Sequence, residues 1–205
     1  MNNNAKTLAT YERNIEKFIE RTPKDTIGET RVWLDSLIEK VTPDSNILEI
    51  GSGFGRDAEY MKLGGLNVLC TDGATGFVEA LTKKGLSARQ LNILTDDLTD
   101  QYDLIFADAV FEHFTADQLA TVLGKIYDAN VDGGTLGFSV RRGDGEYWST
   151  EKLDEERYFC LWQPEELSEL LTSFGYNVES VIESTGYQDI ERLYFIAGKV
   201  GNRVD

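Results

Sequence analysis

The stretch of sequence that decides the fold is Asn46-Ile-Leu-Glu-Ile-Gly-Ser-Gly-Phe-Gly-Arg-Asp57. Its first part, through Ile50, is a short apolar run with one acid, which is typical of a strand buried on both faces. Glycines then crowd the turn, and a helix-like pattern begins at about Arg56. Because glycine tolerates positive φ and has no side chain, the backbone N–H groups of such a turn can approach a ligand. The helix start adds partial positive charge that favours an anionic group. This order of strand, glycine turn and helix therefore predicts a binding site.

The next predicted strand supplies a second feature of this site. Leu66-Asn-Val-Leu-Cys-Thr71 is followed by Asp72, an acid about 20 residues after the glycines. A nucleotide-binding α/β sheet places a carboxylate on a ribose diol at this position. The alternative is an ordinary glycine turn with an acid that only caps a helix. The combination of both features favours a nucleotide site with Asp72 as the ribose ligand.

The composition indicates one soluble domain. The chain has 205 residues, of which 41% are hydrophobic and 27% are charged, and its net charge is -16. Such an acidic surface repels nucleic acid and anionic membranes, so neither is an expected partner. The two cysteines, Cys70 and Cys160, and the single histidine, His113, support neither a disulfide framework nor a metal site. The start of the sequence lacks an apolar leader, and we expect a cytoplasmic monomer or homodimer.

Periodicity places the remaining elements. After a loose tail over residues 1 to 8, helices are predicted through Tyr11 to Ile19, Val32 to Val41, 56–63, 76–84, 115–129 and 163–174. Further strands are predicted over 87–93, 101–107, 135–140, 176–183 and 193–200. Residues 141–160 are polar and aromatic without a clear period. Alternating strands and helices predict a parallel sheet, whereas the short connection between the last two strands predicts an antiparallel pair.

These segments together resemble the class I S-adenosylmethionine-dependent methyltransferases. The motifs that carry the resemblance are Leu48-Glu-Ile-Gly-Ser-Gly-Phe-Gly55, Asp72 with Gly73, Leu91-Asn-Ile93, the segment Tyr102-Asp-Leu-Ile-Phe-Ala-Asp-Ala-Val-Phe-Glu-His113, and Asp132-Gly-Gly134. Many members of the family have Asp where this chain has Asn92. The resemblance implies an α/β, Rossmann-like, doubly wound fold. It has a seven-stranded, mostly parallel sheet with an antiparallel C-terminal strand pair, and helices on both faces.

The expected chain is a single methyltransferase domain over residues 1–205. Within it we expect an N-terminal helical lid or flank (1–43), a cofactor-binding core (44–140), a substrate-side insertion (141–163), and a C-terminal helix with antiparallel strands (164–205). The resemblance implies S-adenosylmethionine as the cofactor. The candidate cofactor-binding residues are Glu49, Gly51, Ser52, Gly53, Gly55, Arg56, Asp72, Gly73, Asn92, Ile93, Asp108, Ala109 and Tyr11.

The chemistry of the cofactor suits these residues. The glycine backbone can meet its amino-acid carboxylate, and Glu49 can face its ammonium through water. Asp72 can accept both ribose hydroxyls, and Asn92 can bond the adenine edge. The alternatives are that Glu49 is a buried acid satisfied by backbone N–H groups and that Asn92 and Asp108 cap turns. Likewise, the alternative for Arg56 is that it balances charge on its own helix and does not contact the ligand.

Methyl transfer from a sulfonium is an in-line displacement, so the protein has mainly to align the acceptor, and a general base is needed only if the acceptor must lose a proton. His113 is the obvious base candidate, with a packing role as the favoured alternative. Tyr11 is predicted to close over the methionyl end of the cofactor, or else to be a core aromatic.

The insertion concentrates basic and aromatic residues in an acidic protein. Its candidates for binding a carboxylate or phosphate of a small acceptor are Arg141, Arg157, Tyr158 and Tyr147. The alternative is that the arginines form surface ion pairs with Asp144, Glu146, Glu151 and Glu155.

The sequence therefore predicts a methyltransferase that acts on a small-molecule acceptor. One alternative is a catalytically silent module that binds the cofactor and only regulates. Another is a nicotinamide-dependent reductase, although none of the nine tyrosines has a lysine four residues on, as the usual Tyr-x-x-x-Lys pair requires.

Overall fold

The computed structural model describes residues 2–185 and 190–200. The helices are α1 (Asn3–Arg13), α2 (Ile15–Glu20), α3 (Gly28–Ile38), α4 (Arg56–Leu63), α5 (Thr75–Lys83), the 3-10 turn η1 (Phe111–His113), α6 (Ala116–Ala129) and α7 (Pro164–Ser173). The strands are β1 (Ile47–Ile50), β2 (Val68–Asp72), β3 (Ser87–Gln90), β4 (Tyr102–Asp108), β5 (Asn130–Arg141), β6 (Glu146–Ser149), β7 (Arg157–Cys160), β8 (Tyr176–Thr185) and β9 (Glu191–Lys199).

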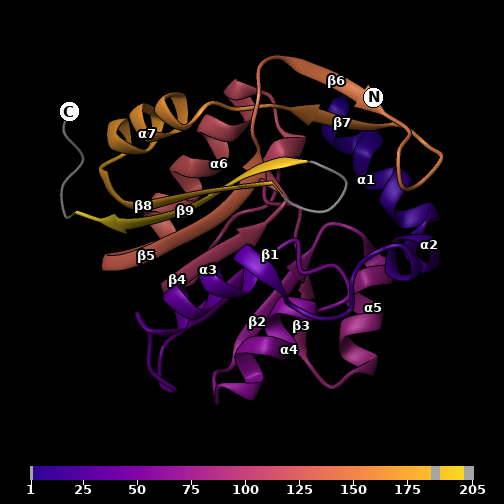
Figure 1. Cartoon of the computed structure of the whole chain (residues 1–205). Helices are drawn as coiled ribbons and strands as arrows, with labels where there is room; N and C mark the ends of the chain where they lie inside the picture. The colour runs from indigo at the N-terminus through magenta and orange to yellow at the C-terminus, as the bar shows by residue number, and fades with distance from the viewer. Residues whose placement is uncertain (1, 186–189, 201–205) are drawn as a thin grey trace.

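The main sheet has seven strands in the order β3-β2-β1-β4-β5-β9-β8 (Figure 1). The pairs from β3 to β5 are parallel, and β9 runs antiparallel to both β5 and β8. The predicted fold class is therefore confirmed. Because the chain first builds outward from β1 to β3 and then returns to β4, the strand order reverses between β1 and β4. Ligands bind at this switch point in open α/β sheets.

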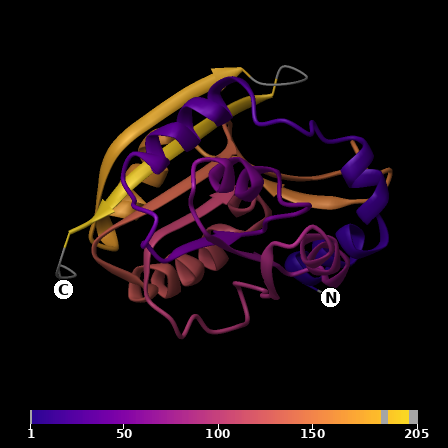
Figure 2. The ribbon, with the colours of Figure 1, turned by 90° about the horizontal axis from the view of Figure 1, so that it is seen from below.

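Both faces of the sheet are covered by helices, so the central strands alternate between two apolar cores. On one face Leu48 and Ile105 pack with residues of α6 and α7. On the other, Ile47 and Leu104 pack with residues of α3, α4 and α5. Figure 2 shows α3 lying along β8 and β9, where Trp33 donates a hydrogen bond to the carbonyl of Phe195. The result is a rigid three-layer support for the carboxyl edge of the sheet.

Several features differ from the sequence expectation. The predicted helix through Tyr11 to Ile19 is two helices, α1 and α2, and the predicted strand over 87–93 ends at Gln90. Residues 141–160 contain an antiparallel hairpin, β6 with β7, which the absence of a period concealed. The chain is helical from Asn3 onward, where a loose tail was expected, because α1 packs on this hairpin through polar side chains. Thr7 accepts a hydrogen bond from the N–H of Tyr158, and Thr10 donates one to the carbonyl of Glu156.

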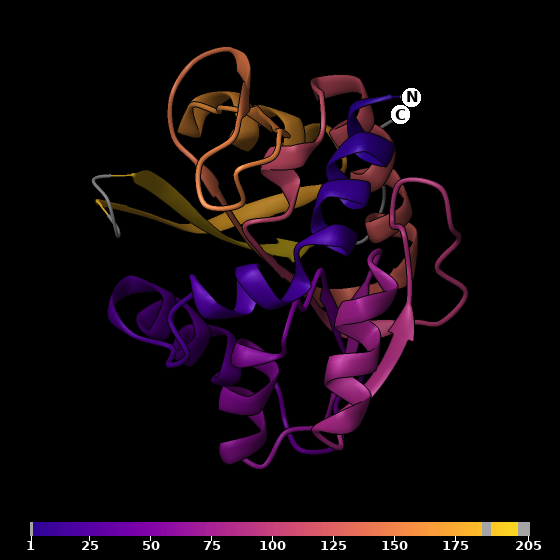
Figure 3. The same ribbon diagram turned by 90° about the vertical axis from the view of Figure 1, so that its right-hand side faces the viewer.

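The first two helices run across the front of the molecule in Figure 3. They are joined to the hairpin by ion pairs between exposed side chains, such as Arg13 with Glu155 and Lys6 with Glu156. Their inner face reaches the carboxyl edge of the sheet, where Leu8 lies against Gly73. The division of the chain into flank, core and insertion stays a prediction. Across the described ranges, no helix has the length and apolar character needed to span a bilayer.

Candidate functional site

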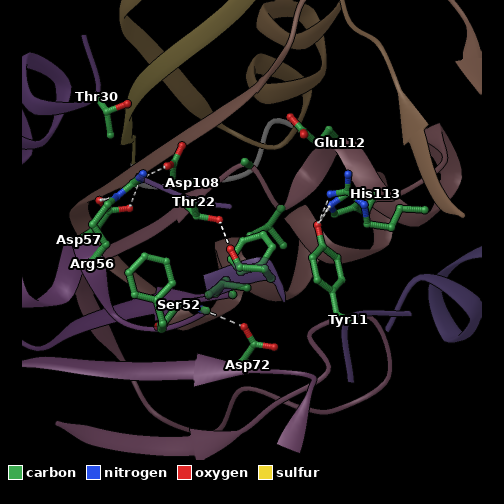
Figure 4. A pocket seen from close by; sticks show the side chains of 18 of the residues that line it. Tyr11, Thr22, Thr30, Ser52, Arg56, Asp57, Asp72, Asp108, Glu112 and His113 are labelled. Atoms are coloured by element: carbon green, nitrogen blue, oxygen red, sulfur yellow. Dashed lines mark hydrogen bonds and ion pairs between the residues drawn. The ribbon is translucent and has the colours of Figure 1, made fainter. Parts of the chain in front are cut away.

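A cavity of about 940 Å³ lies at the carboxyl ends of β1, β2 and β4, at the switch point of the sheet. Its walls come from the glycine turn after β1, from α1 and α2, and from the segment that joins β6 to β7. Figure 4 shows the polar side chains that face it, with Asp72 on one side and Glu112 and His113 on another. The topology therefore gathers residues that are far apart in the sequence.

At Gly51, the first residue of the glycine turn, the backbone lies too close to Val110 for a side chain to fit. Gly51 has a φ of 70°, and a Cβ there would lie 2.4 Å from Cγ2 of Val110. The N–H of Ser52 donates to the carbonyl of Thr71, at 2.8 Å, which ties the turn to β2. The bare main chain after β1 is thus held at the cavity wall.

Asp72, the last residue of β2, meets this turn directly. Its Oδ2 accepts a hydrogen bond of 3.0 Å from the N–H of Gly53, and its Oδ1 accepts one of 2.8 Å from the N–H of Ala74. Burial raises the pKa of Asp72 to about 6, although the backbone hydrogen bonds oppose this rise. Each carboxylate oxygen retains acceptor capacity, because one backbone N–H does not use both of its lone pairs.

Glu49 is the buried acid of β1, and it lines the cavity. Its Oε2 is buried without a hydrogen-bond partner among the described residues. Burial, reinforced by the charge of Asp57, raises the pKa of Glu49 to about 8. Backbone N–H groups of the described residues therefore do not satisfy Oε2. A cationic ligand group would supply the missing partner.

Asp108 ends β4 and belongs to an ion-pair cluster. Its Oδ2 lies 2.7 Å from Nη2 of Arg56, which also bonds Asp57 of its own helix, and its Oδ1 accepts a hydrogen bond from Ser139. Burial alone would raise the pKa of Asp108, but the positive charges of Arg56 and Arg192 lower it below its usual range. Asp108 is therefore an ionised residue of the cavity lining, and Arg56 neutralises its charge.

The loop after β3 carries the predicted adenine contacts. Asn92 and Ile93 both line the cavity. The side-chain oxygen of Asn92 accepts from the N–H of Leu94, as in an Asx turn, while its amide nitrogen donates to Oδ1 of Asn4 at 3.0 Å. The expected turn-capping role is thus present together with a place at the cavity.

The strand-four segment also supplies Ala109 and His113. Ala109 has a φ of 59° and donates its N–H to Oγ of Ser139. His113 lies on η1 with Nδ1 at 2.7 Å from the carbonyl of Tyr158 and Nε2 at 2.9 Å from the hydroxyl of Tyr11. Since a carbonyl only accepts, Nδ1 carries the proton, and the neutral ring accepts the Tyr11 hydroxyl at Nε2. Burial lowers the pKa of His113 to about 4.

The four insertion candidates separate into two groups. Arg141 and Arg157 line the cavity, whereas Tyr147 and Tyr158 are outside its described lining. Tyr158 donates instead to Glu146, and Tyr147 accepts from Arg141. The predicted surface ion pairs with neighbouring acids are also absent for these two arginines within the described chain: Arg141 pairs with Glu112, at 3.4 Å, and Arg157 pairs with no carboxylate.

Sequence reasoning missed several residues of the cavity. Arg192 of β9 donates to Glu112 and to Ser139, and Lys152 projects from the β6–β7 connection. Arg192 comes from an antiparallel strand whose neighbour is set only by the folded sheet. A weak signal existed for Glu112, an acid within the strand-four motif beside His113.

Comparisons with known proteins agree with this geometry. Residues 48–136 match the family model described as a methyltransferase domain. No protein of curated function matches the sequence. The solved structures give the fold: that of the Burkholderia thailandensis 1,6-didemethyltoxoflavin-N1-methyltransferase with bound 1,6-didemethyltoxoflavin and S-adenosylhomocysteine has a TM-score of 0.67 at 20% identity. The alignment covers 83% of this chain and 77% of that one.

A second solved structure covers nearly the whole chain. The magnesium protoporphyrin IX methyltransferase of Synechocystis PCC 6803, with bound S-adenosylmethionine, has a TM-score of 0.75 at 11% identity, over 97% of this chain and 98% of that one. At such low identities the likeness shows a shared fold. This is the fold that the sequence motifs predict.

Proposed function

We propose that this chain, which has the fold of S-adenosylmethionine-dependent methyltransferases and carries a methyltransferase-domain match, transfers a methyl group to a small-molecule acceptor. The observation that carries the proposal is the contact between Asp72 and the glycine turn, at the switch point of the sheet. Sequence spacing alone predicts the same constellation. The domain match favours this reading over a nicotinamide-dependent reductase.

The residues present fit S-adenosylmethionine, which agrees with the cofactor predicted from the sequence. The buried and unpartnered Oε2 of Glu49 suits the ammonium of the amino-acid end. The carboxylate of that end suits the start of α4, whose first N–H groups have no partner within the helix. Asp72 would accept the ribose hydroxyls, and the adenine would lie between Asn92 and Gly73, with Ile93 as apolar wall. S-adenosylmethionine supplies a methyl group already activated on a sulfonium.

The chain's own contribution to the reaction is positioning. Side chains of α1 and α2 close the cavity from one side: Phe18 lies 3.5 Å from the position of a Cβ on Gly53. Tyr11 is held by two hydrogen bonds, donating to His113 and accepting from Arg157. His113 has both ring nitrogens engaged and a lowered pKa, which supports a role in holding Tyr11 rather than that of a general base. We assign it as a positioning residue.

The shape of the cavity supports a small acceptor. Its volume of about 940 Å³ suits a cofactor together with a compact second substrate, and side chains of α1 and α2 form part of its wall. The net charge of -16 also opposes association with a nucleic acid backbone. Of the insertion candidates, the proposal keeps Arg141 and Arg157 as the acceptor side of the cavity.

A ligand-binding comparison followed by a turnover assay tests the proposal. S-adenosylhomocysteine should raise the melting temperature of the protein, and NADH at the same concentration should not. Turnover is then measured as S-adenosylhomocysteine released from S-adenosylmethionine with extracts of small metabolites. Release that depends on the extract supports an enzyme. Binding without release from any fraction would favour the silent regulatory module, and absence of binding would contradict the proposal as a whole.

A further inference from the structure

The cationic side chains of the cavity differ in how their charge is balanced. The described lining contains Arg21, Arg56, Arg141, Lys152, Arg157 and Arg192. Four of them have a carboxylate within ion-pair distance: Arg56 with Asp57 and Asp108, Arg141 and Arg192 with Glu112, and Arg21 with Asp154. Over the described part of the chain, Lys152 and Arg157 have none. The imbalance is therefore confined to Lys152, in the connection between β6 and β7, and Arg157, the first residue of β7.

Arg157 is an unpaired cation in a buried position, with 4% of its surface exposed. Its Nη1 donates to the hydroxyl of Tyr11 at 3.0 Å and its Nη2 to the backbone carbonyl of Glu151 at 2.8 Å, so both acceptors are neutral. Its Nε is buried without a partner among the described residues. A buried guanidinium is costly without a counter-charge, and its unused donor is suited to an oxyanion.

Lys152 stands on the same side of the cavity. Its Nζ lies 4.1 Å from the centre of the Phe18 ring, and no hydrogen bond of this ammonium to a described residue is present. Burial, together with the positive charges of Arg157, Arg56 and Arg192, lowers the pKa of Lys152 to about 8. An anion beside it would stabilise the charged ammonium. Lys152 and Arg157 thus both lack a carboxylate within ion-pair distance in the described part of the chain.

The proposed binding of the cofactor does not involve Lys152 or Arg157. The proposed cofactor contacts use Glu49, Asp72 and the glycine turn, and no hydrogen bond or ion pair joins Lys152 or Arg157 to these residues in the described part of the chain. Outside the cavity the protein carries a large negative charge, which works against the capture of an anion. An anionic ligand would therefore depend on a local positive pair.

We propose that the methyl acceptor is a small organic anion whose carboxylate, phosphate or phosphonate group binds Arg157 and Lys152. This inference rests on the proposed function and specifies its acceptor. The oxyanion takes the free Nε donor of Arg157 and the ammonium of Lys152, and Tyr11 is held beside it by Arg157.

Inorganic phosphate, the minimal probe of such a site, tests the inference. The protein is saturated with S-adenosylhomocysteine, and its melting temperature is followed as phosphate is added, against sodium chloride of equal ionic strength. We expect phosphate to stabilise the complex and Lys152→Gln or Arg157→Gln to weaken phosphate binding by about tenfold or more. Arg157→Lys should restore part of the loss. The matched control is Lys83→Gln, which removes an exposed charge of α5 outside the cavity lining.

The same variants distinguish failure of the anion-site inference from failure of the proposed methyltransferase function. Because Arg157 holds Tyr11, its variant is checked for folding by circular dichroism, and Lys152, whose side chain makes no such bond, serves as the second test. Affinity for S-adenosylhomocysteine should stay within about threefold in both variants, since neither side chain is bonded to Glu49, Asp72 or the glycine turn. Loss of this affinity would place the cations on the cofactor and overturn the inference. So would phosphate stabilisation that is missing in the wild type or retained in both variants. A wild type that binds no S-adenosylhomocysteine would instead overturn the proposed function.

Discussion

The N–H of Gly53 donates a hydrogen bond of 3.0 Å to Oδ2 of Asp72, joining the turn after β1 to the last residue of β2 across 19 positions of the sequence. This bond fixes the glycine turn against the end of β2 and orients the carboxylate at the cavity. A ligand that binds both elements is therefore met by one preorganised unit. The expected consequences for each part of this unit can be measured.

Glu49 should release a proton when the cofactor binds. Its pKa of about 8 leaves the carboxyl mostly protonated near neutral pH, and an ammonium beside it favours the charged form. Calorimetry of S-adenosylhomocysteine binding near pH 7, in buffers of different ionisation enthalpy, should show release approaching about one proton. Glu49→Gln should abolish it. Equal proton release in the variant would show that the proton comes from another group.

The same carboxyl should shape the stability of the ligand-free protein. Because its pKa is higher in the folded state than in the unfolded chain, the folded state holds a proton that the unfolded chain has released. Stability should therefore fall as pH rises from about 4.5 to about 8, by at most about 1.4 kcal/mol per pH unit. Urea unfolding across this range checks the slope. Glu49→Gln should flatten it, and an unchanged slope would contradict the assignment.

Gly51→Ala should destabilise the protein by more than the backbone conformation explains. Positive φ alone costs an alanine about 1 kcal/mol, and the contact of its Cβ with Val110 at 2.4 Å forces a further shift. Gly85, with a φ of 73° and open space around its Cβ position, provides the matched control. We expect Gly51→Ala to cost about 1–3 kcal/mol more than Gly85→Ala in urea unfolding. Equal costs would mean that Val110 moves away freely.

The pH profile of turnover should show no inflection from His113 near the ordinary pKa of a histidine. With its pKa lowered to about 4, the ring stays neutral throughout the working range. Removing the ring should instead lower stability, by about 1–3 kcal/mol, because Tyr11 and the carbonyl of Tyr158 each lose a partner. The rate of His113→Gln, measured once an acceptor is known, should stay within about tenfold of the wild type at saturating substrate. A loss of a thousandfold with normal folding would restore the base role.

The alternation of strands and helices and the cofactor wall could be predicted because local sequence patterns mark them, whereas the seven-stranded sheet follows only from the family resemblance. The apolar run ending at Ile50, the turn at Gly51 and the acid at Asp72 each follow from spacing. The carboxyl ends of neighbouring parallel strands must then meet. The acceptor wall could not be predicted in the same way. Thr7 and Thr10 of α1 are buried by hydrogen bonds to the hairpin, so no apolar period marks their face.

The charge balance of the insertion also required the fold. Arg141 forms an ion pair with Glu112, and Arg192 of β9 forms a second one with the same carboxylate, although the three residues lie far apart in the sequence. Nearby acids along the chain suggested local ion pairs for Arg157, but its strand turns the guanidinium inward instead, toward Tyr11. Which cation keeps a free charge is decided by tertiary neighbours. Lys152 gave no sequence signal for this reason.

The measurement that tests the account most directly is calorimetric titration of S-adenosylhomocysteine into the wild type and Asp72→Asn. An asparagine has one acceptor oxygen, so it can satisfy Gly53 or Ala74 but not both, and it accepts the ribose hydroxyls less well. We predict one site in the wild type and an affinity about 10- to 100-fold weaker in Asp72→Asn. The control Asp132→Asn, which removes an exposed charge, should bind as the wild type does. Absence of heat with the folded wild type, or equal affinity in Asp72→Asn, would contradict the central claim.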